Sequence, residues 1–136
     1  MDSNNWQQIL FSGKGRIRRS QYWLWSVLKF IFFAIIYSIA GMITGSSQQL
    51  MAAGTIPPAM IVVYLVCIPL SIYMGACIGA KRWHDRDRSG WMYLILFIPL
   101  VGVIWNLVEC GCLDGTQGPN QYGPSPKGIQ NPEKVF

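Results

Sequence analysis

Three long apolar stretches dominate the chain, and short polar segments separate them. Residues 22–44 carry one charge, and residues 59–80 and 91–108 carry none. An apolar helix of about 20 residues is long enough to cross the hydrocarbon core of a bilayer. These stretches are apolar all round, whereas a surface helix of a soluble protein keeps a polar face. The pattern therefore predicts an all-α integral membrane protein with three transmembrane helices in a small helical bundle.

The polar segments set the boundaries of the expected parts. They are a basic amino-terminal segment (1–21), a first transmembrane helix (22–44), a loop (45–58), a second helix (59–80), a charged loop (81–90), a third helix (91–110) and a Gly/Pro-rich tail (111–136). Pro69 and Pro99 each remove a backbone donor inside a predicted helix. We expect a kink at both positions.

Charge asymmetry predicts the orientation of these helices. Eight of the eleven Lys and Arg residues lie in two clusters, before the first helix and between the second and third, whereas the loop 45–58 has no charge. Positively charged segments stay in the cytoplasm, so the amino terminus is predicted to be cytoplasmic and, after three spans, the tail external. The clusters also account for most of the positive charge behind the net value of +5. A nucleic-acid partner is therefore not needed to explain this charge, because basic residues beside a membrane commonly contact anionic lipid.

The segment Ile98-Pro99-Leu100-Val101-Gly102 leaves a second interpretation of the third stretch open. A break at this point would fold the stretch into a re-entrant hairpin and return the tail to the cytoplasm. Irregular backbone at that depth has to be buried in protein, and three helices offer little cover. We therefore expect a straight or kinked span.

The two basic clusters form the candidate binding site. At the first and third predicted helices a cation and a Ser precede the aromatic residues Tyr22 and Trp91. A Ser can cap a helix, and a helix amino terminus beside Arg favours phosphate. Simple caps and snorkelling anchors would explain the same residues without a ligand. The candidate anion-binding residues are Arg16, Arg18, Arg19, Ser20, Arg82, His84, Asp85, Arg86, Arg88 and Ser89.

Asp85 is expected to be the internal counter-ion of the charged loop. If the helix continues past residue 80, Lys81 lies four residues from Asp85, and Arg82 and Arg88 lie three residues from it, spacings that bring partners together. His84 is a candidate for an acid–base role, because imidazole titrates near neutral pH. However, adjacent residues do not face each other on a helix, and no nucleophile motif accompanies them. No catalytic residue is assigned.

Small residues predict where the helices pack. Stripes of small side chains allow close approach in lipid, between two helices or two copies of the chain. The expected packing residues are Ala34, Ser38 and Gly41 on the first helix and Ser71, Gly75 and Gly79 on the second. The four cysteines lack the paired spacing of a structural zinc site, so neither a metal nor a cofactor is predicted.

Four blocks of the sequence together resemble a known family. In order they are FSGKGRIRRSQYW, AKRWHDRDRSGW, IPLVG and GTQGPNQYGPSP, and they extend from Phe11 to Pro126. They are similar to the signature blocks of the family called domain of unknown function 805, small bacterial inner-membrane proteins. The charged loop departs from the family's usual form at Trp83 and at Arg86-Asp87. The resemblance implies a multi-pass protein of the bacterial inner membrane and supplies no reaction.

Three functions remain open at this point. The leading hypothesis is a non-enzymatic membrane module whose cytoplasmic Arg-rich face binds anionic phospholipid headgroups or an acidic partner. The alternatives are an oligomeric transport or channel component, which needs a homo-oligomer or a membrane-protein partner, and a lipid-modifying enzyme that uses His84 and Asp85.

Overall fold

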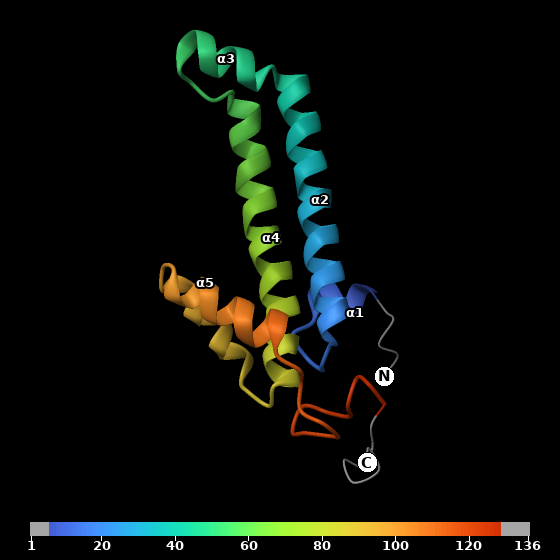
Figure 1. Cartoon of the computed structure of the whole chain (residues 1–136). Helices are drawn as coiled ribbons and strands as arrows, with labels where there is room; N and C mark the ends of the chain where they lie inside the picture. Colours follow the sequence, from blue (N-terminus) through green and yellow to red (C-terminus); the bar gives the residue numbers. More distant parts are fainter. Residues whose placement is uncertain (1–5, 129–136) are drawn as a thin grey trace. The chain divides into compact units, whose positions relative to one another are not determined.

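The computed structural model describes residues 6–128, and the regular elements among these residues are all helices, without any β-strand. Residues 1–5 of the basic segment and 129–136 of the tail lie outside the described residues. The elements in Figure 1 are α1 (Trp6–Phe11), α2 (Arg19–Thr44), α3 (Ser46–Ala53), α4 (Pro58–Asp85), the 3₁₀ helix η1 (Gly90–Phe97), α5 (Val101–Asn106) and the π-helix η2 (Leu107–Cys112). The predicted all-α class and the first two helices are confirmed.

The chain divides into two units. Residues Val27–Tyr73 form one unit, which we call the helical hairpin, and the residues before and after it form the other, which we call the terminal unit. The helical hairpin contains most of α2, all of α3 and the first part of α4. The terminal unit contains α1, the first turns of α2, the last turns of α4 and the described residues that follow α4.

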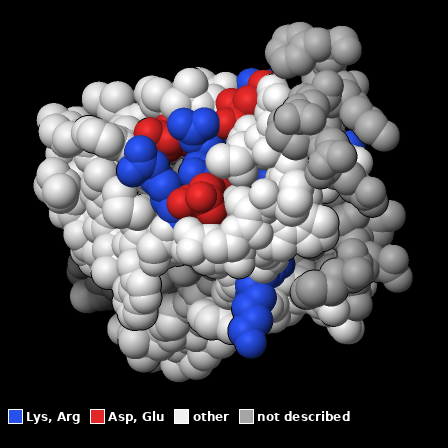
Figure 2. Space-filling view, turned by 90° about the horizontal axis from the view of Figure 1, so that it is seen from below, with Lys and Arg blue, Asp and Glu red and all other residues white. Residues whose placement is uncertain are grey.

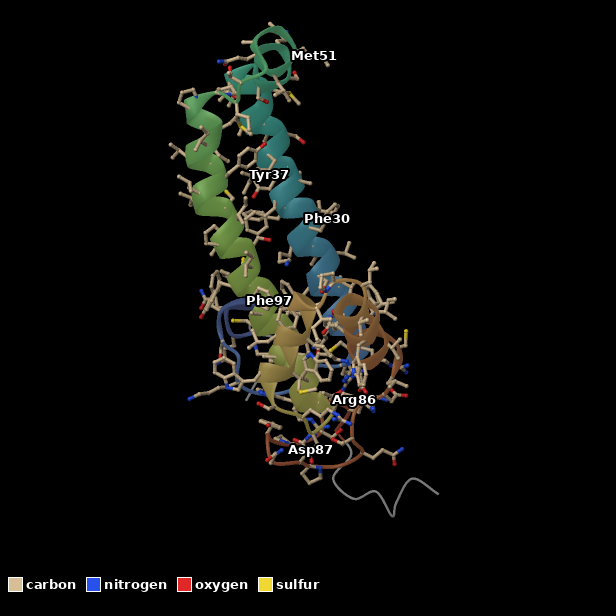
Figure 3. All side chains as sticks on the ribbon, turned by 90° about the vertical axis from the view of Figure 1, so that its left-hand side faces the viewer. Phe30, Tyr37, Met51, Arg86, Asp87 and Phe97 are labelled. Atoms are coloured by element: carbon tan, nitrogen blue, oxygen red, sulfur yellow. The ribbon has the colours of Figure 1, made fainter. Side chains whose placement is uncertain are left out.

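In the helical hairpin, α2 and α4 lie side by side and α3 joins them (Figure 1). Tyr37 lies between the two helices, where its ring packs 5.4 Å from that of Tyr64, whereas Phe30 points away from α4 (Figure 3). Lys29 Nζ donates to the carbonyl oxygen of Ser71 at 3.3 Å. The one charge inside the first apolar stretch thus has a partner on the neighbouring helix.

Both long helices leave most of their apolar surface uncovered. Only 6% of the most apolar part of α2 and 22% of that of α4 is buried, and Phe30, Met42 and Ile43 are 73%, 78% and 80% exposed. The core helix of a soluble protein would be mostly buried. By length, composition and exposure, α2 and α4 are therefore candidate membrane spans. α4 continues through Pro69 as one helix, and a kink there stays a prediction.

The predicted single helix over 91–110 does not form. Instead η1 ends at Phe97, the chain turns at residues 98–100, and α5 packs back against η1 (Figure 1). We call η1, this turn and α5 the apolar hairpin. Eight residues of 3₁₀ helix extend only about 16 Å, roughly half of a 30 Å hydrocarbon core. The structure therefore supports the hairpin interpretation of the third stretch.

The turn has a local cause. The residue before a proline avoids helical backbone angles, and Ile98 is extended, with φ −87° and ψ 109°. Leu100 follows with φ 61° and ψ −62°, and Val101 N donates to Pro99 O at 2.7 Å. These are the features of a γ-turn, which is strained for a residue with a side chain. Pro99 therefore reverses the chain rather than kinking a span.

Two further boundaries differ from expectation. α4 runs to Asp85, so the first half of the predicted charged loop is helical. The predicted packing residue Gly79 is buried, and a Cβ there would overlap the ring of Tyr93 in η1, so this small residue accommodates the apolar hairpin. Among the other predicted packing residues Gly75 is buried, Ser38 is exposed, and Ala34, Gly41 and Ser71 are half-buried.

The apolar hairpin requires glycine at position 102. A Cβ on Gly102 would overlap the carbonyl group of Ile95, because α5 and η1 touch through their backbones at this point. Gly102 N also donates to Ile98 O at 2.9 Å. Gly102→Ala should destabilise the protein by about 1–3 kcal/mol, the usual cost of overpacking. Thermal unfolding in detergent measures this as a lowered midpoint. Gly13→Ala is the matched control, since nothing lies within 4 Å of a Cβ there, and equal midpoints for the two variants would contradict the close approach.

Candidate functional site

A buried cluster of two arginines and one aspartate lies in the terminal unit. Arg16 Nε donates to Asp85 Oδ1 at 3.0 Å, and Arg16 Nη2 lies 2.9 Å from the same oxygen in the ion pair. Arg82 Nη1 donates to Asp85 Oδ2. Arg16, Arg82 and Asp85 are 8%, 0% and 3% exposed. The carboxylate of Asp85 therefore joins the amino-terminal segment to the end of α4. We call these three residues the Arg–Asp–Arg cluster.

Arg16 uses its remaining donors to hold the tail. Its Nη1 donates to the carbonyl oxygens of Gly118 at 2.8 Å and Gly123 at 3.2 Å. Its Nη2 donates to Thr116 O at 2.8 Å and to Thr116 Oγ1 at 3.1 Å. Because a guanidinium has five N–H donors in a fixed plane, one buried Arg16 fixes three separate points of the tail. The side chain of Arg16 therefore joins the amino-terminal segment to the tail.

Arg82 holds the returning end of the apolar hairpin in the same way. Its Nε donates to Cys110 O at 2.7 Å, and its Nη2 donates to Leu113 O. The backbone of Asp85 adds a further link, because its carbonyl accepts from Thr116 N at 2.8 Å. A Cβ on Gly115 would overlap the Asp85 carboxylate. The end of α4 is thus enclosed by the segment that follows η2.

His84 makes a second connection between the same segments. Its Nδ1 lies 3.2 Å from Gly15 O, and because a carbonyl only accepts, Nδ1 carries the proton. The imidazole stacks on Tyr122 with centroids 3.9 Å apart and planes 8° apart. Asn120 Nδ2 donates to the backbone carbonyl of His84 at 2.8 Å. The side chains of His84 and Asp85 therefore contact different partners.

The more exposed charges form ion pairs around this buried cluster. Arg19 Nη2 and Lys127 Nζ each lie 2.9 Å from Asp114 Oδ1, and Arg86 Nε lies 3.0 Å from Glu109 Oε2. The hydrogen bond from Lys127 lowers the pKa of the Asp114 carboxyl. A lowered pKa keeps this group ionised at neutral pH, so any stability it adds is lost only as the pH falls through that pKa. On the face in Figure 2, positive and negative side chains are accordingly interleaved.

The structure divides the predicted anion-binding residues into three groups. Arg16, Arg82 and Asp85 are buried, His84 and Arg86 are half-buried, and the others are exposed, namely Arg18, Arg19, Ser20, Arg88 and Ser89. The two buried arginines donate their hydrogen bonds to protein groups.

The predicted capping serines also differ from each other. Ser89 caps η1 and accepts from Trp91 N at 3.4 Å. Ser20 lies inside α2, and the cap is instead Arg18, whose carbonyl accepts from Tyr22 N at 2.9 Å. The Gln21 side chain accepts from Arg18 N at 3.2 Å, as in a capping box.

Several residues of the site were missed in the sequence analysis. Trp83 is fully buried, and its Nε1 donates to Asn106 Oδ1 at 3.2 Å. Asn106 Nδ2 in turn lies 3.5 Å from Tyr22 OH. The signal was available, since Asn106 is the one amide in an otherwise apolar stretch, and a buried amide needs polar partners. The tail residues Thr116 and Asn120 belong to a sequence block that was noted but given no role.

Removing the charge of Asp85 should release the tail. Asp85→Asn leaves two buried guanidinium groups without a counter-ion, and breaking a buried pair costs about 3–5 kcal/mol. We expect faster tryptic cleavage at Lys127 and a lower unfolding midpoint. Asp87→Asn makes the same chemical change at an exposed position two residues away and should behave as wild type. Identical cleavage rates for the two variants would contradict the role of the cluster.

Comparisons with known proteins agree with this description. The family described as "Protein of unknown function (DUF805)" matches residues 10–124. "Uncharacterized protein YiiR" of Escherichia coli K12 is 30% identical, over 91% of this chain and 92% of its own. "Inner membrane protein YhaI" of the same organism is 34% identical, over 83% of this chain and 84% of its own. "Inner membrane protein YhaH" of that organism is 32% identical, over 84% of this chain and 86% of its own. No solved structure matches significantly. The chain is a small inner-membrane protein of the DUF805 family.

Proposed function

We propose that both ends of the chain lie in the cytoplasm. In this arrangement α2 and α4 cross the membrane, and the apolar hairpin enters it from the cytoplasmic side and leaves on the same side. The contacts of Arg16 with Thr116 and Gly118 support the arrangement, because they join the amino-terminal segment to the tail. The positive clusters at residues 14–19 and 81–88 support the cytoplasmic location of that end.

A reporter fused after Phe136 tests this topology. An enzyme that is active only in the cytoplasm should be active in the fusion, and one that is active only outside should be inactive, because two spans return the chain to its starting side. A fusion to the loop 45–58 is the internal control and should give the opposite result. An external signal from the carboxyl-terminal fusion would restore the three-span arrangement.

We further propose that the protein is a non-enzymatic module that binds anionic phospholipid headgroups of the inner leaflet. The observation that carries this proposal is a set of exposed cations beside exposed aromatic and apolar residues at the helix ends. Arg18 lies close in sequence to Trp23, which is 44% exposed, and Arg88 to Trp91, which is 78% exposed. Tryptophan prefers the headgroup region, and nearby basic residues attract anionic lipid.

We assign this role to fewer cations than the sequence suggested. Arg16 and Arg82 are buried in the Arg–Asp–Arg cluster, and Arg19 and Arg86 pair with acidic side chains. Arg18 contributes one hydrogen bond to Pro126 O but remains exposed. Lys14, Arg18 and Arg88 are therefore the cations that we assign to headgroups, with Ser89 at the amino terminus of η1 beside them.

Neutralising these three cations should weaken binding of anionic lipid. Each basic residue near an anionic surface contributes about 1 kcal/mol, so the triple variant Lys14→Gln, Arg18→Gln, Arg88→Gln should lose on the order of 100-fold in affinity. Native mass spectrometry in mixed micelles would measure bound phosphatidylglycerol against phosphatidylcholine.

A charge-preserving triple variant is the matched control. Lys14→Arg, Arg18→Lys and Arg88→Lys keep all three charges, and this variant should retain anionic lipid as wild type does. Undiminished retention by the neutral variant would refute headgroup binding. Retention lost in both variants would also contradict it, because positive charge at the three positions would then not account for lipid binding.

A further inference from the structure

A cleft of about 360 Å³ lies between the last turns of α4 and η1, within the terminal unit. Its walls are mainly apolar, formed by Ala76, Ala80 and Leu94 together with Tyr93 and Trp91. Its polar end is formed by His84 and Ser89. Ligand sites commonly occupy 300–1,000 Å³ and combine apolar walls with a few fixed polar groups. The cleft has this composition, and its volume lies at the lower end of this range.

The imidazole at the polar end is held in one orientation. Nδ1–H donates to Gly15 O at 3.2 Å, and Tyr122 stacks on one face of the ring. In neutral imidazole a protonated Nδ1 leaves the lone pair on Nε2. Nε2 lies beside Gly90, 3.0 Å from where a Cβ on that glycine would stand. The fixed ring therefore presents a hydrogen-bond acceptor at the end of the cleft.

Ser89 supplies a complementary donor. Its Oγ accepts from Trp91 N at 3.4 Å, and this use of the oxygen leaves the hydroxyl proton available. The residue between Ser89 and Trp91 has to be glycine, because a Cβ at position 90 would lie 2.9 Å from Ala80 Cβ. The polar end thus offers one acceptor and one donor, and the rest of the cleft is mainly apolar.

We propose that this cleft binds a lipid whose headgroup carries a hydroxyl group. The hydroxyl donates to His84 Nε2, an ester or phosphate oxygen accepts from the Ser89 hydroxyl, and the acyl chain follows Ala76, Ala80 and Leu94. The proposal rests on the membrane location in the proposed function, but it depends on a hydroxyl donor rather than on negative charge. The two can therefore fail separately.

The chain contains one histidine, so ¹⁵N-labelled histidine gives the imidazole signals of His84 alone. The protein would be studied near neutral pH in a detergent without hydroxyl groups, and phosphatidylglycerol, diacylglycerol or phosphatidylcholine would be added. A hydrogen bond to a lone pair shifts the Nε2 resonance. We expect saturable shifts with phosphatidylglycerol and with uncharged diacylglycerol, both of which carry a hydroxyl, and no shift with phosphatidylcholine.

Two variants complete the test. Ala76→Leu fills the apolar wall without touching the imidazole and should abolish the shift, while the neutral triple variant Lys14→Gln, Arg18→Gln, Arg88→Gln should keep the shift with diacylglycerol. Three outcomes would overturn the lipid site. They are an Nε2 resonance that does not shift with either hydroxyl lipid, an equal shift with phosphatidylcholine, and a shift that persists in Ala76→Leu. Loss of phosphatidylglycerol selectivity with the diacylglycerol shift retained would count against the charge-based function only.

Discussion

The carboxylate of Asp85 is the contact on which the rest of the terminal unit depends. Its single negative charge offsets one of the two buried guanidinium charges. The two guanidinium groups donate their other hydrogen bonds to the backbone carbonyls of residues 110, 113, 116, 118 and 123. Burying three charges is costly, and a buried ion pair often adds little net stability. Here it specifies which segments meet. A tail with little capacity to form a hydrophobic core is thereby given a fixed path.

The apolar hairpin follows from the same constraint. Pro99 and Leu100 turn the chain, and Gly102 lets α5 approach η1, but a short apolar hairpin buries little surface of its own. Arg82 holds its returning end through Cys110 O and Leu113 O. Because Arg16 then holds the tail, the amino-terminal segment, the end of α4 and the chain after η2 form one polar assembly, from which the exposed cations and the cleft beside His84 face outward.

The sequence predicted the elements well and the connections poorly. Length and hydropathy identified α2 and α4, and helical spacing identified Arg82 as a partner of Asp85, which the structure confirms. The same spacing rule failed for Lys81, which donates to Gln8 O instead. No local rule could pair Arg16 with Asp85, since 69 residues separate them. The single helix predicted for the third stretch does not form. A run of 18 apolar residues is compatible with one helix and with a hairpin, and contacts distant in sequence decide between them.

Hydrogen exchange of the tail tests this account most directly. Composition alone describes residues 114–126 as an exposed Gly- and Pro-rich segment, whereas the structure has Thr116 N donating to Asp85 O at 2.8 Å and Gly123 N donating to Asn120 O at 3.0 Å. In the detergent-solubilised wild-type protein we expect both amides to exchange far more slowly than in an unstructured peptide. Exchange of these amides at the rate of an unfolded chain would show that the tail is free, and would contradict the role given to the Arg–Asp–Arg cluster.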